Sequence, residues 1–164
     1  MTKADTKYDY DLLVIGGGPA GQRAAVQAAK IRKRVCIVDK LIVVGGNCVN
    51  TGTIPSKSFK EAVVFLSGYR QRNIYGAGYR VKSEIEMKDL TFRCNRILQI
   101  ERDVIRHQLS RNHIDMVEGH ARFVDKHCVE ITTGDGNTVK KTANIILIAV
   151  GAKPHRPENI EFDG

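Results

Sequence analysis

YDLLVIGGGPAGQRAAVQAAKIRKRVCIVD, residues 10–39, sets two apolar segments around a glycine cluster and an alanine-rich segment. Tyr10–Ile15 predicts a short buried strand that ends at the glycines. Pro19–Lys30 predicts a helix, since proline is tolerated in a first helical turn. Arg34–Asp39, with its β-branched residues, predicts a second strand. This βαβ order indicates an α/β fold with a parallel sheet.

The glycine cluster between the first strand and the first helix has dinucleotide-binding spacing. Gly16, Gly18 and Gly21 form G-x-G-x-x-G. In this pattern the first glycine permits a tight turn, the second lets the backbone approach a pyrophosphate, and the third lets the helix pack closely on the strand. Asp39 ends the second strand, where a carboxylate can accept hydrogen bonds from ribose hydroxyls. The order of these features favours a dinucleotide site over a structural glycine turn, but it does not separate FAD from NAD.

Residues 53–112 predict a helical segment that follows a glycine-containing loop at Lys40–Thr53. Ile54–Tyr69 and Lys88–Arg111 predict its two main helices, because apolar residues recur there at helical spacing. The expected apolar stripe of the second helix comprises Leu90, Cys94, Ile97, Leu98, Val104, Ile105 and Leu109. Its arginines are expected on the solvated side: Arg93, Arg96, Arg102 and Arg106.

Residues 114–143 predict a small antiparallel β-meander. The segments IDMVEG, ARFVD, CVEIT and TVKKTA are short and alternating, and a glycine-rich turn at Gly134–Asn137 indicates a hairpin. Ile145–Val150 is apolar throughout and predicts a separate strand in the interior of the parallel sheet.

Composition and charge exclude several classes of function. The 164 residues are 42% hydrophobic and 27% charged, as in a soluble globular protein. No apolar run approaches the roughly 20 residues that cross a bilayer, and the polar N-terminus does not resemble a secretory signal. We therefore expect a cytoplasmic protein with no membrane partner. The net charge of +8 is dispersed, so nucleic acid is not an expected partner either.

The cysteines and histidines predict neither a metal site nor a disulfide framework. Cys36, Cys48, Cys94 and Cys128 are scattered without a C-x-x-C pair. No histidine lies in an H-E-x-x-H pattern, so a zinc site is not expected.

GGNCVNTGTIPSK, Gly45–Lys57, resembles the redox segment of the pyridine nucleotide-disulfide oxidoreductases, a family of flavoenzymes. Their pattern is C-x-x-x-x-C followed by a proline and a lysine. Here Cys48 fills the first cysteine position and Thr53 the second. Because a disulfide needs two sulfurs about 2 Å apart, this segment cannot form the family's redox disulfide.

Three further matches extend the resemblance over essentially the whole chain. Lys57 corresponds to the family's flavin-side lysine, Gly119–Phe123 to its G-x-A-x-F segment at the adenosine end, and Ile148–Pro154 to its I-A-T-G-S-x-P segment. The family's first glycine fingerprint holds FAD, so the resemblance implies a Rossmann-like FAD-binding domain. It implies an FAD site formed by Gly16, Gly18, Pro19, Ala20, Gly21, Asp39, Lys40, Gly45, Gly46, Asn47, Cys48, Lys57, His120, Ala121, Ala149 and Gly151.

A single cysteine in this segment is similar to the pattern of the family's transhydrogenase members. That resemblance implies hydride transfer between NADPH and NAD through FAD. It also implies that Lys57 lies near the flavin, the alternative being a solvated lysine at the start of a helix. Cys48 is then expected to be a packing residue beside the flavin, the alternative being a reactive thiolate. Two other functions stay open, a dihydrolipoamide dehydrogenase-like flavin reductase with another acceptor and a non-catalytic dinucleotide-binding module.

The family pattern also predicts that this sequence is the N-terminal portion of an FAD-binding domain. A second glycine fingerprint, expected of a nicotinamide-binding domain, does not occur, and the dimerisation domain is also expected to be absent. We therefore expect residues 1–164 alone to bind FAD weakly and to show no turnover, whereas a full-length subunit would form a homo-oligomer.

Overall fold

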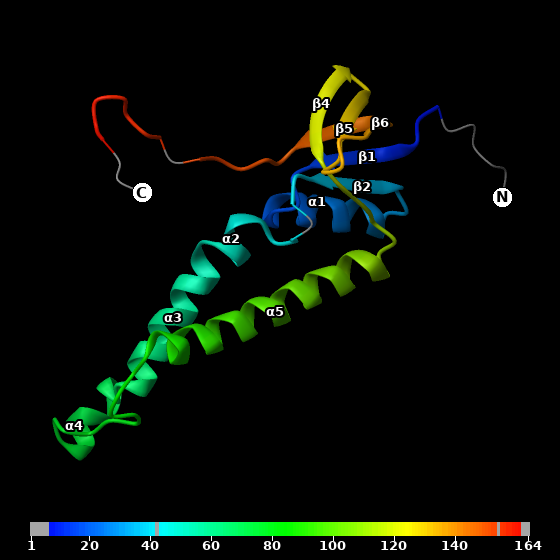
Figure 1. Cartoon of the computed structure of the whole chain (residues 1–164). Helices are drawn as coiled ribbons and strands as arrows, with labels where there is room; N and C mark the ends of the chain where they lie inside the picture. The colour runs from blue at the N-terminus through cyan, green and yellow to red at the C-terminus, as the bar shows by residue number, and fades with distance from the viewer. Residues whose placement is uncertain (1–6, 42, 154, 162–164) are drawn as a thin grey trace.

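A computed structural model describes residues 7–41, 43–153 and 155–161. The chain forms one six-stranded sheet with helices packed against it, and a long helical arm extends away from the sheet (Figure 1). The strands are β1 Tyr10–Ile15, β2 Val35–Asp39, β3 Asp115–Glu118, β4 His120–Asp125, β5 Cys128–Thr132 and β6 Thr138–Ile148. The helices are α1 Pro19–Lys30, α2 Gly46–Asn50, α3 Thr53–Leu66, the 3₁₀ turn η1 Tyr69–Gln71, α4 Arg72–Tyr75 and α5 Met87–Arg111. The predicted α/β class is confirmed.

The sheet has the strand order β3-β2-β1-β6-β5-β4, and its first four strands are parallel. Leu12–Ile15 of β1 pairs with Val35–Val38 of β2 on one side and with Ile145–Ile148 of β6 on the other. The predicted βαβ unit is thus confirmed, with β1 and α1 at the predicted bounds. Alternate residues of β1 and β2 are buried on opposite faces, which explains the apolar runs in these two strands. The segment Ile145–Val150 was expected to be an interior strand, but Ile145 and Ile148 are 59% and 61% exposed.

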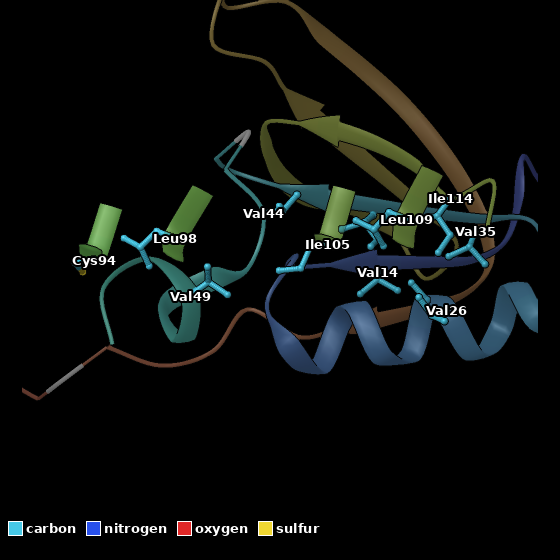
Figure 2. Packing of buried hydrophobic residues seen from close by; sticks show 12 residues of the cluster. Val14, Val26, Val35, Val44, Val49, Cys94, Leu98, Ile105, Leu109 and Ile114 are labelled. Carbon is cyan, nitrogen blue, oxygen red and sulfur yellow. The ribbon is translucent and has the colours of Figure 1, made fainter. Parts of the chain in front are cut away.

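Each face of the parallel strands has its own core. One face packs Val14, Val35 and Ile37 against α1 and the C-terminal half of α5, and Figure 2 shows Val26, Ile105 and Leu109 among the side chains that join them. The opposite face packs the side chains of Leu13, Cys36, Val38, Val129, Ile131 and Ala143. The meander therefore covers the sheet on the side away from α1.

The antiparallel part of the sheet is smaller than residues 114–143. β3 pairs parallel with β2, with Cys36 opposite Asp115, so this strand belongs to the parallel part. Antiparallel pairing begins with β4 and β5 and continues between β5 and β6. The sequence of β3 looks like a meander strand because β3 lies at the edge of the sheet and its side chains are mostly exposed.

One strand, β6, replaces the two strands predicted at TVKKTA and Ile145–Val150. Residues 138–142 of β6 pair antiparallel with β5, and residues 143–148 pair parallel with β1. The polar first half and the apolar second half lie in different environments, so the change in composition does not mark a break in the strand.

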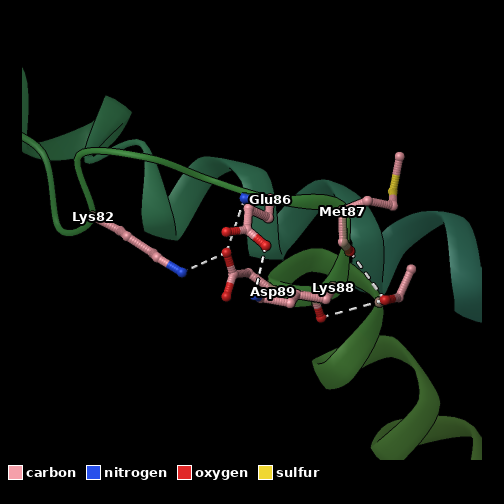
Figure 3. A network of polar contacts seen from close by, with 6 residues as sticks. Lys82, Glu86, Met87, Lys88 and Asp89 are labelled. Atoms are coloured by element: carbon pink, nitrogen blue, oxygen red, sulfur yellow. Dashed lines mark hydrogen bonds and ion pairs between the residues drawn. The ribbon is translucent and has the colours of Figure 1, made fainter.

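The helical segment contains the two long helices that the sequence predicts, with shifted ends. α3 starts at Thr53 and α5 at Met87. Glu86 and Asp89 form a capping box at the start of α5, and Lys82 Nζ lies 2.6 Å from Asp89 Oδ2 (Figure 3). The predicted stripe of α5 is wrong at Val104, which is 56% exposed.

The predicted loop at residues 40–53 contains a short helix, α2, which the sequence analysis did not predict. The side chain of Asn50 donates hydrogen bonds to the carbonyl oxygens of Val44 and Gly46, and these bonds close the single turn of α2 in spite of its glycines. Among the helices of the described residues, none combines the length and the apolarity of a membrane span.

Candidate functional site: two glycine turns at the carboxyl end of the sheet

The G-x-G-x-x-G turn lies between the end of β1 and the start of α1, and at its first and third glycines a side chain larger than hydrogen would collide with backbone. Gly16 has a φ of 109°, and a Cβ there would overlap the carbonyl oxygen of Ala149. A Cβ at Gly21 would overlap the carbonyl oxygen of Gly16 and lie 3.0 Å from the side chain of Val14. The first and third glycines therefore serve the turn and the helix–strand packing, as their spacing predicts.

Gly18 has a different role from the other two glycines. A Cβ at Gly18 would meet nothing closer than the Cα of Gly46, at 4.0 Å, so the space beside it is open. Gly18 is also the N-cap of α1, and no side chain of the described residues caps this helix. Pro19 has no N–H, which leaves the amides of Ala20 and Gly21 at the positive end of the helix dipole. This arrangement fits an anionic group such as a pyrophosphate.

Gly17 is held through both of its backbone polar groups. Its N–H donates to Asp39 Oδ2 at 2.6 Å, and its carbonyl oxygen accepts from Gln22 Nε2 at 2.6 Å and from the Gly45 N–H at 3.3 Å. Gln22 is buried within α1, so this contact is shielded from water. The turn is thereby fixed before any ligand arrives.

The carboxylate of Asp39 has a structural role that the sequence analysis did not predict. Besides the bond to Gly17, its other oxygen, Oδ1, accepts from the Leu41 N–H at 3.1 Å. A carboxylate has about four acceptor positions, so Asp39 retains capacity for a ribose hydroxyl. Lys40, the next residue in the chain, is exposed.

A second glycine turn, Gly45–Gly46, packs directly on the first. Gly45 and Gly46 both have positive φ, and a Cβ at Gly46 would lie 2.8 Å from the Cα of Gly18. Asn47 and Cys48 follow within α2, Asn47 exposed and Cys48 half-buried. The structure therefore brings the redox-segment residues Gly45–Cys48 beside the dinucleotide fingerprint.

Thr53 and Lys57 lie one turn apart at the start of α3, and both are exposed. The link between α2 and α3 is tight, because the N–H groups of Thr51 and Gly52 donate to the carbonyl oxygen of Asn47 at 3.0 and 2.7 Å. Thr53 thus begins the helix directly after the turn that carries Cys48.

The two C-terminal matches reach the same end of the sheet. The Gly119 N–H donates to the carbonyl oxygen of Asp39 at 2.8 Å, so His120 and Ala121 start β4 beside the end of β2. The Ala149 N–H donates to the carbonyl oxygen of Ile15 at 2.8 Å. A Cβ at Gly151, whose φ is 73°, would meet nothing within 4 Å. Pro154, the last residue of the matched segment Ile148–Pro154, lies outside the described residues.

Three residues that the sequence analysis did not assign to the site support it, namely Gln22, Asn50 and Arg102. Arg102 was expected on the solvated side of α5, but it is half-buried, and its Nε–H donates to Asn50 Oδ1 at 2.9 Å. A glutamine inside an alanine-rich helix is a sequence signal for Gln22. The Asn50–Arg102 contact joins residues 52 positions apart, and no local pattern reveals it.

The clearest pKa shifts among buried groups occur at the opposite end of the sheet. Burial raises the pKa of the Cys36 thiol to about 11, and Asp115 adds to this effect. Burial and the hydrogen bond from Tyr10 Oη to Asp115 Oδ2, 2.9 Å long, raise the pKa of Tyr10. These groups line the amino ends of the strands, so their chemistry is separate from the glycine turns.

The fold is of the Rossmann-like type, and the two glycine turns lie where this type of domain binds dinucleotides. The chain belongs to the pyridine nucleotide-disulphide oxidoreductase family, whose family model matches residues 10–164. The predicted family is thereby confirmed.

Relatives of this chain include proteins named soluble pyridine nucleotide transhydrogenase. The relative from Mycobacterium tuberculosis (strain ATCC 25177 / H37Ra) is 48% identical over 94% of this chain and 33% of its own length. The relatives from Colwellia psychrerythraea and Escherichia coli O9:H4 are 34% and 33% identical over 97% and 94% of this chain, and 34% and 33% of their own lengths. The chain thus spans about a third of these relatives.

The fold also matches a solved structure, the Cu(II) complex of the HOCl-induced flavoprotein disulfide reductase RclA from Escherichia coli. The two structures superpose with a TM-score of 0.73 at 24% identity, over 91% of this chain and 30% of the other. This likeness supports the fold alone.

Proposed function

We propose that this chain forms the FAD-binding part of a flavoprotein that transfers hydride between NADPH and NAD. One observation carries the proposal, namely that a rigid pair of glycine turns lies beside a segment with a single sulfur. Cys48 stands in α2, while Thr53, which cannot form a disulfide, begins α3. The transhydrogenase names of the relatives support the same activity.

The residues present fit FAD. Gly18 leaves room beside the uncapped N-terminus of α1, where the amides of Ala20 and Gly21 would bind the pyrophosphate. Asp39 would accept from the adenosine ribose, and the backbone at His120 and Ala121 would meet the adenosine end. Other predicted residues would line the site from the second glycine turn and α2, from the segment directly after β6, and from the first turn of α3.

Bound FAD would supply reversible two-electron chemistry, and the protein supplies orientation and charge. The Lys57 ammonium on α3 would stabilise negative charge near the flavin. Thr53 leaves no second thiol within this segment to which electrons could pass, which favours a nicotinamide nucleotide as the acceptor. The full-length protein would bind NADPH and NAD as substrates and would assemble as a homo-oligomer.

Anaerobic titration tests this proposal on a full-length protein that contains these residues. NADPH should bleach the flavin absorbance, and NAD should then restore it without exposure of new thiols to a thiol reagent. Purified protein without flavin would overturn the assignment. Reoxidation by lipoamide or another disulfide, but not by NAD, would instead favour the dihydrolipoamide dehydrogenase-like alternative.

Cys48 offers a second test, because its role distinguishes transhydrogenation from thiol chemistry. Cys48→Ser should keep most of the NADPH-to-NAD activity of the full-length protein, because a lone thiol has no resolving partner. Cys128→Ser, at a half-buried position in β5, is the matched control. Turnover should be measured at saturating flavin, and its loss in Cys48→Ser with FAD still bound would contradict the packing role.

A further inference from the structure

Arg102 connects the long helix α5 to the short helix α2. Its Nε–H donates to Asn50 Oδ1 at 2.9 Å, and its side chain is half-buried. Arg106, one turn further along α5, is exposed and lies 3.4 Å from Asp103 of the same helix. The two arginines carry the same charge on the same helix, but of the two only Arg102 has a partner outside α5 among the described residues.

The side-chain amide of Asn50 links Arg102 to the second glycine turn by hydrogen bonds on both sides. Its oxygen accepts from Arg102, and its nitrogen donates to the carbonyl oxygens of Val44, at 3.1 Å, and Gly46, at 2.9 Å. An amide nitrogen has two N–H donors, so both are used. The partners also fix the amide orientation, because carbonyl oxygens can only accept and a guanidinium can only donate.

The residue between these two carbonyl groups is Gly45, which contacts the dinucleotide fingerprint. The Gly45 N–H donates to the carbonyl oxygen of Gly17 at 3.3 Å, and Gly46 packs on Gly18. Glycine loses more backbone freedom than any other residue when it is ordered, so a Gly-Gly turn needs external contacts to hold one conformation. Asn50 supplies such contacts on both sides of Gly45.

We infer that Arg102 is a positioning residue for the Gly45–Gly46 turn. Through Asn50 it holds the Gly45–Gly46 turn against Gly17 and Gly18, so that the wall of the pyrophosphate site is formed before the ligand binds. A pre-formed site raises affinity because the ligand does not have to order the loop. The identity of the ligand as FAD rests on the proposed function, whereas the positioning of the turn does not.

The test compares Arg102→Met with Arg106→Met in the 164-residue chain. Both variants remove one cation from α5 and keep an unbranched apolar side chain. Hydrogen exchange of the Gly45 amide, measured by NMR without cofactor, should accelerate about tenfold in Arg102→Met, the effect of losing one hydrogen bond from a charged donor. In Arg106→Met it should stay at the wild-type rate. Arg102→Lys, whose ammonium can still donate to Asn50, should fall between the wild type and Arg102→Met.

FAD affinity, measured by flavin fluorescence with the same substitutions in a full-length protein that contains these residues, should fall in the order in which the exchange rates rise. Asn50→Ala provides the second measurement, because it removes the group through which Arg102 acts. Adding Arg102→Met to Asn50→Ala should accelerate Gly45 exchange no further, as expected for two residues in one network. If Arg102→Met fails to fold by circular dichroism, Arg102→Lys and Asn50→Ala carry the same comparison.

Equal Gly45 exchange in Arg102→Met and Arg106→Met would overturn the inference, as would additive effects in the double variant. Altered exchange with FAD affinity unchanged in every variant would also overturn it, since the turn would then not serve the cofactor. A full-length wild-type protein that contains these residues and binds no FAD would refute the proposed function. If the Gly45 amide of the 164-residue chain still responds to Arg102→Met and not to Arg106→Met, the positioning of the turn is supported even so.

Discussion

At Gly21, the absence of a Cβ atom allows α1 to pack closely against the Gly16 turn. A Cβ at this position would overlap the carbonyl oxygen of Gly16, which is backbone and cannot rotate away. Gly21→Ala should therefore lower the free energy of unfolding by about 1–3 kcal/mol, as overpacking does elsewhere. Urea denaturation checks this value. Gly134→Ala, in a turn where a Cβ would meet nothing within 4 Å, is the control and should change stability little.

The four cysteines differ in burial, and their reactivity should follow it. Cys36 is buried with a pKa raised to about 11, so almost none of it is thiolate at pH 8. Cys94 is also buried, whereas Cys48 and Cys128 are half-buried. Under native conditions at pH 8, iodoacetamide should modify Cys48 and Cys128 well before Cys36, as followed by peptide mass spectrometry. Early modification of Cys36 in folded protein would contradict the packing of β2.

The sequence predicts where the glycine turn of the fingerprint lies, but it does not predict the hydrogen bonds that hold this turn. G-x-G-x-x-G reports backbone conformations that only glycine adopts, so spacing alone locates the turn. The hydrogen bonds of Gly17 to Asp39, Gln22 and Gly45 depend on how the chain returns to this point. Such tertiary contacts leave no periodic signal, and neither does the contact between Asn50 and Arg102.

Helix α5 begins with a cap that contains the Asp89 carboxylate, and protonation of this group should lower the stability of the folded state. The hydrogen bond from Lys82, together with that from the Glu86 backbone N–H, lowers the pKa of Asp89. The lowered pKa stabilises the folded state above the ordinary Asp value of 3.8. That stabilisation is lost as the pH falls through the still lower folded pKa.

Asp89→Asn should therefore reduce stability at neutral pH and flatten the decline of stability as the pH falls below the ordinary Asp value of 3.8. Thermal unfolding over that range, followed by circular dichroism, measures the slope. Glu84→Gln removes a carboxylate from the loop just before the cap and serves as the control. An unchanged slope in Asp89→Asn would show that the contact with Lys82 does not persist in solution.

At the element scale, sequence pattern located every long helix and misassigned two strands. α1, α3 and α5 follow from apolar periodicity, because each buries one face. β3 was assigned to the meander because an edge strand with exposed side chains looks the same in either kind of sheet. β6 was divided because its two halves meet different neighbours, β5 and β1. The residue pattern of a strand indicates which side chains are buried, but it does not identify the strands that pair with it.

For the whole molecule, the arrangement explains why residues distant in sequence form one site. The ends of β1, β2 and β6 meet at the same edge of the sheet, and the start of β4 joins them through the bond between Gly119 and Asp39. Ligands of open α/β sheets bind outside the carboxyl ends of the strands. The general place of the site was therefore predictable from the βαβ order, whereas the support from α5 was not.

The continuity of β6 has a consequence for how fast the chain folds. β6 joins β5 through the short turn at residues 133–137, yet its partner β1 lies more than a hundred residues away, as the bond between Asp9 and Thr142 illustrates. Closing the long loop costs more entropy than closing the hairpin. We therefore expect the β5–β6 hairpin to form first and to dock on β1 as a unit.

Stopped-flow kinetics can test this order. Ile131→Val, in the hairpin, should mainly slow folding, whereas Ala62→Gly in α3 should mainly speed unfolding. The opposite assignment of rates would place the nucleus in the helical arm. During synthesis, β1 leaves the ribosome before β6 and obtains its second neighbour only after residue 148 has emerged. The pairing of β1 with β6, which places Ala149 against the Gly16 turn, therefore forms later than the pairing of β1 with β2.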